Sequence, residues 1–500
     1  MSGERVVIIG AGIGGLSAAV DLCARGLDVT VIERAATAGG KLSEVHAGGV
    51  GIDSGPTVFT MRWVFEALFE AAGTTLDQHL TVRRAETLAR HSWPDGATFD
   101  LFADLERSVA AVGELAGAAE AKRFRAFAAR AALIYRVLEE PFIRKAKPNV
   151  LGLTLDIGLH RPADQWSIMP YRSMWSELGR YFKDPRLRQL FGRYATYCGS
   201  SPFKSPATLM LIAHVEQQGV WLVEGGMQRI PEALADLVGT LGGSIRYGET
   251  CSRIVRDGGR ASAVVLASGE RIEADAIIVN ADPGALAGGC FGADAALAVD
   301  PTPARTRSLS ALTFAFMAEA VPAPLARHNL FFSPDYVAEF DALHAGRMPE
   351  IPTVYVCAQD RPDGDGPAVT NGPERLFAIV NAPPDGDAHT YSPEEIETCR
   401  SRTFRSMERC GVRLDPRPET MAVTTPDGFE KRFPATGGAL YGRAGHGWDG
   451  AFRRPGARTR MPGLYLCGGG THPGAGVPMA ALSGRSAASA VLADRASTRR

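Results

Sequence analysis

The chain has 500 residues, of which 45% are hydrophobic and 22% are charged, and its formal net charge at pH 7 is -1. This length is too great for one ordinary hydrophobic core and predicts two or more domains, while the composition is typical of a soluble globular protein. The balanced charge gives no electrostatic reason to expect a nucleic acid partner, and eight scattered cysteines without a Cys-x-x-Cys pair argue against a disulfide framework and a structural metal site.

The chain opens with a predicted strand–turn–helix–strand unit of the kind that binds nucleotides. RVVII (residues 5–9) is typical of a buried parallel strand, and Gly10, Gly12 and Gly15 of the following GAGIGG fit the pattern G-x-G-x-x-G. LSAAVDLCARG then predicts a helix and LDVTVIE a second strand, with Glu33 at its end. All the parts of a dinucleotide fingerprint are therefore present in the expected order.

Each part of this unit has a physical role in holding a nucleotide. Gly10 permits a tight turn, Gly12 lets the backbone approach a pyrophosphate, and Gly15 allows the helix to pack closely on the strand. The start of the helix offers free N–H groups to the phosphates, and Glu33 can bind the ribose hydroxyls. The residues that we expect to bind the nucleotide here are Gly10, Gly12, Ile13, Gly14, Gly15, Glu33 and Arg34.

The residues after Glu33 favour FAD over NAD. A second glycine turn, Gly39–Gly40–Lys41, is followed by the segment Asp53–Ser54–Gly55–Pro56. FAD is the longer molecule and needs further close backbone approaches, so we expect Gly40, Lys41 and Gly55 to bind it as well. The placing of Gly-Gly-Lys after the acidic residue resembles the large FAD family that includes amine oxidases, Rab GDP-dissociation inhibitors and carotenoid desaturases.

The middle of the chain mixes helical and strand patterns. Residues 57–140 predict a helix, two strands around a Pro-Asp-Gly turn, and an Ala-rich helical stretch. Residues 141–230 hold helical segments with an aromatic and basic stripe, SMWSELGRYFKDPRLRQLFGRYATYCGS. Such a stripe is typical of an ordinary core, and it is also compatible with the lining of an apolar tunnel or with contact to lipid.

An α/β pattern returns at residues 223–283, with a predicted helix over Pro231–Leu241 and the strands SIRYGE, VVLAS and AIIVN. In the FAD family that the chain resembles, this segment completes the FAD domain, and the residue at Cys251 presents its backbone to the adenine. More strands follow, and Ser392 and Glu395 predict a capping box at the start of a charged helix.

A last strand, loop and helix end the chain. MPGLYLC predicts the strand, GGGTHPGAG is a glycine loop, and the helix is expected to begin near Pro478. A helix start can stabilise negative charge on a flavin ring. A phosphate site and a purely structural turn are the alternatives, but the first loop already serves the phosphates. We therefore expect the flavin ring to be bound by Gly470, Val477, Pro478 and Met479.

The last loop points to a narrower family. GLYLCGGGTHPGAGVP, ADAIIVNADP and EGGMQRIPEAL together resemble bacterial phytoene-desaturase-type carotenoid desaturases, and VPMAALSGR resembles the hydroxyneurosporene and methoxyneurosporene desaturase branch of purple phototrophs. The resemblance implies FAD-dependent formation of the C3–C4 double bond in acyclic 1-hydroxy- or 1-methoxy-carotenoids of the neurosporene or lycopene type, on the way to spheroidene or spirilloxanthin.

The resemblance also implies an α/β fold, in which a Rossmann-like FAD-binding domain is discontinuous in sequence and carries an inserted mixed α+β substrate domain. We expect FAD-binding segments at 1–75, 221–285 and 431–500. The substrate domain is expected at 76–220, which also faces the membrane, and at 286–430.

The chemistry requires few named residues. FPATGGALYG resembles the family's segment over the substrate channel, which makes Tyr441 a candidate for lining it. His472 is the one candidate catalytic residue, and a purely hydrogen-bonding role is its alternative. The sequence holds one dinucleotide fingerprint, already used for FAD, so electrons are expected to pass on to oxygen or to a membrane quinone.

A lipid-dissolved carotenoid substrate predicts peripheral attachment at the cytoplasmic side of the inner or an intracytoplasmic membrane. The scattered cysteines favour a reducing compartment, the run VVII is too short for a signal peptide, and the chain has no run of about 18 apolar residues. FIRKAK (142–147) or residues 171–195 are candidates for contact with lipid headgroups, and a solvated helix face is the alternative for both.

Three other functions remain open from the sequence. A phytoene desaturase differs in substrate alone. An amine oxidase shares the fold but usually flanks its flavin with an aromatic pair, and residues 468–484 contain no aromatic residue. A non-enzymatic module that binds prenylated proteins also shares the fold and would lack bound flavin.

Overall fold

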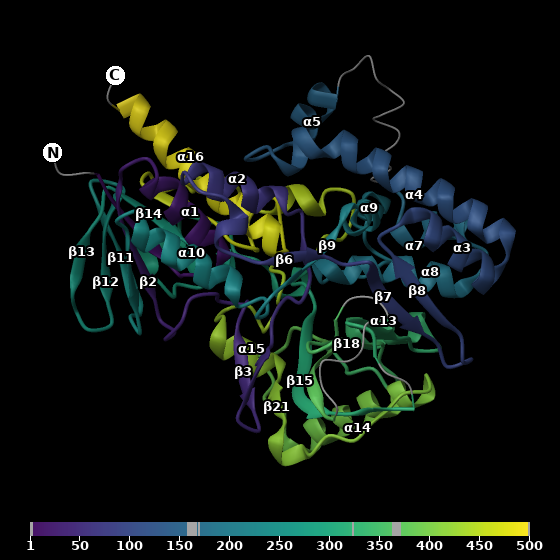
Figure 1. Ribbon diagram of the computed structural model, residues 1–500. Coiled ribbons are helices and arrows are strands. Elements are labelled where there is room, and N and C mark those ends of the chain that lie inside the picture. Colours follow the sequence, from purple (N-terminus) through teal and green to yellow (C-terminus); the bar gives the residue numbers. More distant parts are fainter. Residues whose placement is uncertain (1–3, 158–167, 169–170, 323–324, 363–371, 499–500) are drawn as a thin grey trace.

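The computed structural model describes residues 4–157, 168, 171–322, 325–362 and 372–498 (Figure 1). Its first sheet is parallel throughout and takes its strands from distant parts of the chain. In order across the sheet these are β10 (Ser244–Tyr247), β2 (Asp28–Glu33), β1 (Arg5–Ile9), β14 (Ala276–Val279) and β22 (Leu464–Leu466). The residues of β14 are all buried, as expected for a parallel strand that is covered on both faces.

Helices from three distant parts of the chain cover one face of this sheet. They are α1 (Ile13–Cys23), α2 (Trp63–Ala71), α10 (Arg229–Thr240) and α16 (Val477–Thr498). α1 and α16 lie side by side, and α1 also contacts α10 and α2 (Figure 1). Val6 and Ile8 of β1 point into this core, together with Leu16 and Val20 of α1.

The opposite face packs against a small antiparallel sheet and two short helices. Successive side chains of a strand point to opposite faces, so Val7 and Ile9 join this second core, where they meet Ile254 and Leu286. The elements are β11 (Cys251–Asp257), β12 (Arg260–Leu266), β13 (Arg271–Glu273), α11 (Pro283–Ala287) and α12 (Ala293–Ala296).

A larger sheet lies apart from the first, with seven strands among the described residues (Figure 1). Neighbouring strands are antiparallel except for the parallel pair β17 and β7. In order they are β21 (Ala422–Thr424), β15 (Ser310–Ala318), β19 (Glu374–Ala382), β18 (Val354–Ala358), β17 (His328–Phe331), β7 (Thr87–Ser92) and β8 (Thr98–Phe102).

The charged helix predicted from the sequence is α14 (Pro393–Arg409), and it packs on this larger sheet. Its predicted capping box is confirmed: the Glu395 N–H donates to Ser392 Oγ at 3.2 Å, and the Ser392 N–H donates to Glu395 Oε2 at 2.8 Å. Two orphan donors at the helix start are thereby satisfied. Cys399 and Met407 face the sheet, which makes the helix amphipathic.

A helical layer completes the molecule. Phe182, Phe191 and Tyr194, from the aromatic stripe noted in the sequence, are buried in its core. α5 stands at its periphery (Figure 1). The elements are α3 (Leu105–Ala116), α4 (Ala118–Leu138), the π turn η2 (Glu139–Ile143), α5 (Val150–Ile157), α7 (Met174–Tyr181), α8 (Pro185–Gly192), η3 (Arg193–Cys198), η4 (Ala207–Met210) and α9 (Leu211–Gln218).

The predicted fold class is confirmed, because the nucleotide-binding sheet is assembled from separate segments and the chain between them builds a mixed region. The exact domain boundaries stay a prediction. No helix in the described ranges is long and apolar enough to cross a membrane. The remaining elements are β3 (Glu44–Ala47), β4 (Val50–Asp53), β5 (Phe59–Thr60), η1 (Leu76–Gln78), β6 (Val82–Arg84), β9 (Val220–Val223), η5 (Ala304–Thr306), β16 (Ala320–Val321), α13 (Tyr336–His344), β20 (Arg413–Leu414), η6 (Pro418–Thr420), α15 (Pro426–Arg432) and η7 (Gly450–Arg453).

Candidate functional site

A cavity of about 1270 Å³ lies where the glycine loops of the parallel sheet meet the larger sheet and the helical layer. Tyr441 lines it, as does every residue predicted to bind FAD except Gly15. Gly15 serves packing instead, since a Cβ there would lie 2.1 Å from the Gly10 carbonyl oxygen. The predicted FAD residues in the lining are Gly10, Gly12, Ile13, Gly14, Glu33, Arg34, Gly40, Lys41, Gly55, Cys251, Gly470, Val477, Pro478 and Met479.

The first and the last glycine loops touch one another. A Cβ on Gly14 would lie 2.8 Å from the Gly468 nitrogen and 2.7 Å from Asn280 Oδ1. Both distances are too short for any side chain, so glycine is required at this contact. The two loops that the sequence separates by more than 450 residues therefore form one continuous wall of the cavity.

Asn280 joins these two loops, although it was not among the residues predicted to bind FAD. Its Nδ2 donates to the Gly10 carbonyl at 3.1 Å, and Cys467 Sγ donates to its Oδ1 at 3.5 Å. The signal for it was present, because the residue follows directly after β14 in the segment ADAIIVNADP. A polar residue at the carboxyl end of a parallel strand lies where such folds bind ligands.

Glu33 is held at the edge of the cavity by the backbone. Its Oε2 accepts a hydrogen bond from the Ala11 N–H at 2.7 Å, and its Oε1 accepts one from the Ala35 N–H at 2.8 Å. Each oxygen keeps a further lone pair, so the carboxylate can still accept hydrogen bonds from ribose hydroxyls. Its orientation is fixed by the turn that also carries the first glycines.

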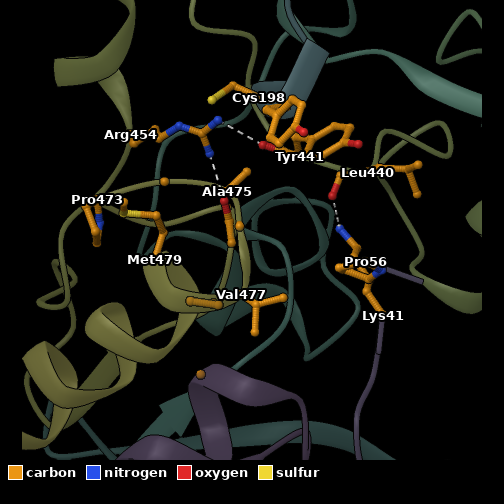
Figure 2. A pocket seen from close by; sticks show the side chains of 18 of the residues that line it. Lys41, Pro56, Cys198, Leu440, Tyr441, Arg454, Pro473, Ala475, Val477 and Met479 are labelled. Atoms are coloured by element: carbon orange, nitrogen blue, oxygen red, sulfur yellow. Dashed lines mark hydrogen bonds between the residues drawn. The ribbon is translucent and has the colours of Figure 1, made fainter. Parts of the chain in front are cut away.

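Arg454, another residue without a sequence assignment, ties the last loop to the segment that carries Tyr441 (Figure 2). Its guanidinium donates to the carbonyl of Gly469 at 2.8 Å, to that of Tyr441 at 2.9 Å and to that of Arg443 at 2.6 Å. Burial lowers the pKa of Arg454. A buried fork of N–H donors thus fixes two loops at once.

Lys41 ends the second glycine turn, and its side chain lies in the cavity wall. Its Nζ donates to the Leu440 carbonyl and lies 5.2 Å from the ring centroid of Phe433 (Figure 2). Burial lowers the pKa of Lys41, and the nearby carboxylate of Asp282 opposes this shift. The lysine therefore links the first FAD segment to the last one, next to Tyr441.

Glu430 fixes the loop at 435–437, which precedes Tyr441 in the chain. Its Oε2 accepts hydrogen bonds from the N–H groups of Thr436 at 2.9 Å and Gly437 at 2.7 Å, and its Oε1 accepts one from the Ala435 N–H at 2.7 Å. One carboxylate thereby satisfies three consecutive backbone donors, which fixes the loop over the cavity.

The start of α16 faces the cavity with Val477, Pro478 and Met479 (Figure 2). The first N–H groups of a helix have no intrahelical partner, and the helix dipole makes this end positive. Gly484, one turn and a half further on, lies against α1, where a Cβ would be 2.0 Å from the Gly14 carbonyl oxygen. This close packing brings the helix start to the cavity.

His472 and Cys251 are less reactive than their types suggest. His472 is not among the lining residues; its Nε2 lies 2.9 Å from the Phe142 carbonyl, and its ring centroid lies 5.0 Å from that of Phe142. Burial lowers the pKa of His472 to about 4, which favours the hydrogen-bonding role. Burial raises the pKa of Cys251 to about 11, so its thiol stays protonated at neutral pH.

The glycine loops at 10–15 and 468–476 are together named the flavin loops. An apolar arm of the cavity leads from them to the helical layer. It is lined by Phe142, Val150, Leu153, Ile157, Ile212 and Val215. Around α5 the apolar surface reaches solvent, because Leu151 is 72% exposed and Tyr171, which also lines the cavity, is 80% exposed. Tyr171 rests against Trp448, with ring centroids 6.0 Å apart.

A polar patch interrupts the apolar lining on the side of the larger sheet. It consists of Arg193 and Tyr197 of η3, Tyr336 of α13 and Tyr355 of β18. Arg193 and Tyr197 lie in the aromatic and basic stripe noted in the sequence, and Tyr336 and Tyr355 lie in two further tracts, so no single motif marks these residues.

The lining fits FAD. Gly10, Gly12 and Gly14 line the cavity beside the start of α1, where the backbone can approach a pyrophosphate without side chains between. The carboxylate of Glu33 and the start of α16 line the same cavity. The site can therefore hold a long dinucleotide whose ring system reaches the apolar arm.

Known proteins resemble this chain in sequence and in fold. A sequence model of the family described as flavin containing amine oxidoreductase matches residues 13–492. Hydroxyneurosporene desaturase from Rubrivivax gelatinosus is 48% identical, with 99% of this chain and 95% of that protein covered, and the one from Cereibacter sphaeroides is 45% identical, with 99% of each covered. A 1-hydroxycarotenoid 3,4-desaturase from a Flavobacterium species is 29% identical, with 96% and 98% covered.

Among solved structures, a putrescine oxidase has a TM-score of 0.60 to this chain. The two sequences are 16% identical, and the match covers 98% of this chain and 99% of the oxidase. At this identity the likeness concerns the fold alone.

Proposed function

The chain belongs to the flavin-containing amine oxidoreductase family, and from this premise we propose that it forms the C3–C4 double bond of acyclic 1-hydroxy- or 1-methoxy-carotenoids. It is an oxidoreductase, and its cofactor is FAD. The proposal extends to the individual residues named above as FAD ligands. Full-length relatives that are named hydroxyneurosporene desaturases support the choice of substrate.

The observation that carries this proposal is the apolar arm, which continues from the surface near α5 to the flavin loops. A long hydrocarbon chain is stabilised by removal from water along the whole arm. The walls would hold the chain in one position and exclude water from the reacting carbons. Such an arm has no use in an enzyme for small polar substrates.

FAD, when bound, supplies the acceptor for the hydride that leaves the substrate. The chain itself contributes position and charge. The start of α16 stabilises negative charge on a group bound beside it, and Arg454 and Lys41 hold the loops on either side of Tyr441 in place. We propose no catalytic base, since His472 is bonded to the Phe142 carbonyl and lies outside the lining.

The lining disfavours an amine as the substrate. Arg193 is a permanent cation in the cavity wall, and it would repel a protonated amine in a site of low dielectric constant. Phytoene, which has no charge, is the more serious alternative. A module that binds prenylated proteins would lack bound flavin. A purified protein without flavin absorbance would therefore support that alternative.

Pigment analysis distinguishes the two carotenoid substrates. Cells that accumulate 1-hydroxyneurosporene and cells that accumulate phytoene are each given this chain, and their carotenoids are separated and identified. We expect a product with one more conjugated double bond from the hydroxylated substrate, seen as a shift of its absorption to longer wavelength. Conversion of phytoene alone would contradict the proposal.

We also propose that the surface around α5 contacts the cytoplasmic side of a membrane, where such a substrate dissolves. Leu151 and Leu155 are 72% and 56% exposed beside the apolar arm. Within FIRKAK, however, Arg144 pairs with Glu139 and Lys145 pairs with Asp156. Apolar side chains would therefore contribute more to this contact than headgroup charges.

Co-sedimentation with phospholipid vesicles tests this contact. We expect the Leu151→Ser and Leu155→Ser double variant to sediment less than the unchanged protein. Leu297→Ser is the matched control, because Leu297 is 68% exposed at a position away from the cavity. Equal binding by all three would contradict the proposal. Adding a quinone to the vesicles under argon then decides between quinone and oxygen as the electron acceptor.

A further inference from the structure

The polar patch (Arg193, Tyr197, Tyr336 and Tyr355) offers hydrogen-bonding capacity that the protein itself leaves unused. The Arg193 guanidinium carbon lies 5.2 Å and 5.5 Å from the ring centroids of Tyr197 and Tyr355. The ring faces attract the cation, and Tyr197 and Glu216 interact with it, but these few partners cannot accept from all five of its N–H donors. Nearby Glu216 already accepts hydrogen bonds from the hydroxyls of Tyr194 and Tyr197.

Tyr336 contributes a second unused group. The residue is 5% exposed and lines the cavity, yet its Oη has no hydrogen-bond partner among the described residues. Its ring is held between Trp175 and Phe340, with centroids at 6.0 Å and 5.0 Å. Buried hydroxyls without a partner are rare in proteins, and this one is fixed in place by its aromatic neighbours.

The patch lies next to the segments that we expect to hold the flavin. Tyr355 Oη is 2.5 Å from the Oγ1 of Thr57, two residues after Gly55. At the other end of η3, a Cβ on Gly199 would lie 2.4 Å from the ring of Tyr441. The patch therefore borders the place where the apolar arm reaches the flavin loops.

The chemistry of the substrate requires a polar group at that place. In a carotenoid oxygenated at C1, the oxygen lies three bonds from C3, so it stays close to the flavin when the C3–C4 bond reacts. We propose that the polar patch binds this oxygen, with Arg193 donating a hydrogen bond to it and Tyr336 accepting the hydrogen of the hydroxyl group. This inference rests on the proposed function and names the residues that select the oxygenated end.

The two contacts predict different responses to three substrates. A 1-hydroxycarotenoid can use both contacts. A 1-methoxycarotenoid can accept from Arg193 but has no hydrogen to donate to Tyr336. Lycopene, which lacks the oxygen, can use neither contact and would leave the buried groups without partners. The unchanged FAD-loaded enzyme should therefore have its highest kcat/KM with the hydroxylated substrate and its lowest with lycopene.

Two variants separate the contacts. Tyr336→Phe should lower kcat/KM for 1-hydroxyneurosporene by about 3- to 10-fold, the usual effect of losing one neutral hydrogen bond, and should change the methoxy substrate less. Arg193→Met should lower kcat/KM for both oxygenated substrates and bring the ratio to lycopene close to one. Tyr391→Phe is the matched control, because Tyr391 is also a buried tyrosine, but its hydroxyl donates to Asp385 and the residue lies outside the cavity.

Two different negative results are possible, one for the proposed function and one for the role of the polar patch. If the unchanged enzyme converts no oxygenated carotenoid, the proposed function fails. If it does so but both variants, with normal flavin absorbance, keep its substrate ratios, the role of the patch is wrong and the proposed function stands. Equal losses on all three substrates would likewise overturn the role of the patch, since they would indicate a general effect on the site.

Discussion

At the scale of single residues, the site depends on side chains that bind backbone rather than ligand. Around the cavity, Arg454 donates to three main-chain carbonyls, Glu430 accepts from consecutive main-chain N–H groups, and Asn280 donates to the Gly10 carbonyl. A side chain of this kind acts on a ligand through the loops that it positions. Its loss should therefore change cofactor affinity more than the chemistry itself.

Arg454 gives the sharpest test of this point. Arg454→Lys keeps the charge but loses the planar fork that reaches three carbonyls, and hydrogen bonds to charged groups contribute about 1.5–3 kcal/mol each. We expect FAD affinity, measured by fluorescence titration of the apoprotein, to fall by at least about 10-fold.

The neighbouring Arg453 provides the control for this substitution. Its side chain is 56% exposed and pairs with Asp449, and such surface pairs contribute little. Arg453→Lys should therefore bind FAD as the unchanged protein does. If Arg454→Lys binds FAD equally well, the guanidinium does not position the loops.

At the scale of elements, the close packing of α16 on α1 sets where the start of α16 lies. Gly484 is the point of closest approach, because a Cβ there would be 2.0 Å from the Gly14 carbonyl oxygen and 3.1 Å from the Ala18 nitrogen. Backbone atoms cannot move aside as a flexible side chain would. A single methyl group at this point must therefore push the two helices apart.

Gly484→Ala should for this reason lower both the melting temperature and the FAD content of the purified protein. Alanine is otherwise the better residue inside a helix by about 1 kcal/mol, so propensity alone predicts the opposite result. Gly239→Ala in α10 is the control that should raise the melting temperature, since a Cβ there has no atom within 4 Å. A Gly484→Ala protein with unchanged melting temperature and flavin content would refute the packing argument.

At the scale of the whole molecule, buried histidines predict a loss of stability in mild acid. Burial lowers their pKa values, to about 3 for His91 and His328 and to about 4 for His446 and His472. Between about pH 6.5 and 4 the unfolded chain binds protons at these positions and the native chain does not. As the pH falls through this range, the free energy of unfolding should decrease by about 1.4 kcal/mol per pH unit for each such histidine.

Urea unfolding at pH 7.5, 6.5 and 5.5 measures this dependence. His446 Nε2 accepts a hydrogen bond from the Ser201 N–H at 3.0 Å, and protonation would remove it. Glutamine can accept the same bond without titrating, so His446→Gln should show a shallower decline with falling pH. A stability that stays constant down to pH 5.5 would contradict the prediction.

Also at the whole-molecule scale, the sequence predicted the parts of the site that are local. The loop at Gly10–Gly15, the acidic end of β2 and the start of α16 are each contained in one short pattern, and all of them lie at the cavity or beside it. Arg193, Asn280 and Arg454 were not predicted. Their roles depend on contacts between distant segments, as in the Asn280–Gly10 bond across 270 positions.

The contact between Gly14 and Gly468 also has a consequence for biosynthesis. The ribosome makes the first loop long before the last one, and the wall of the cavity closes only when residues 464–484 have emerged. Until then β14 lacks its neighbour β22 and presents an open sheet edge, which is a target for chaperones. Capture of FAD is therefore expected only after residues 464–484 have been made, and a yellow protein is one in which they have folded against the first loop.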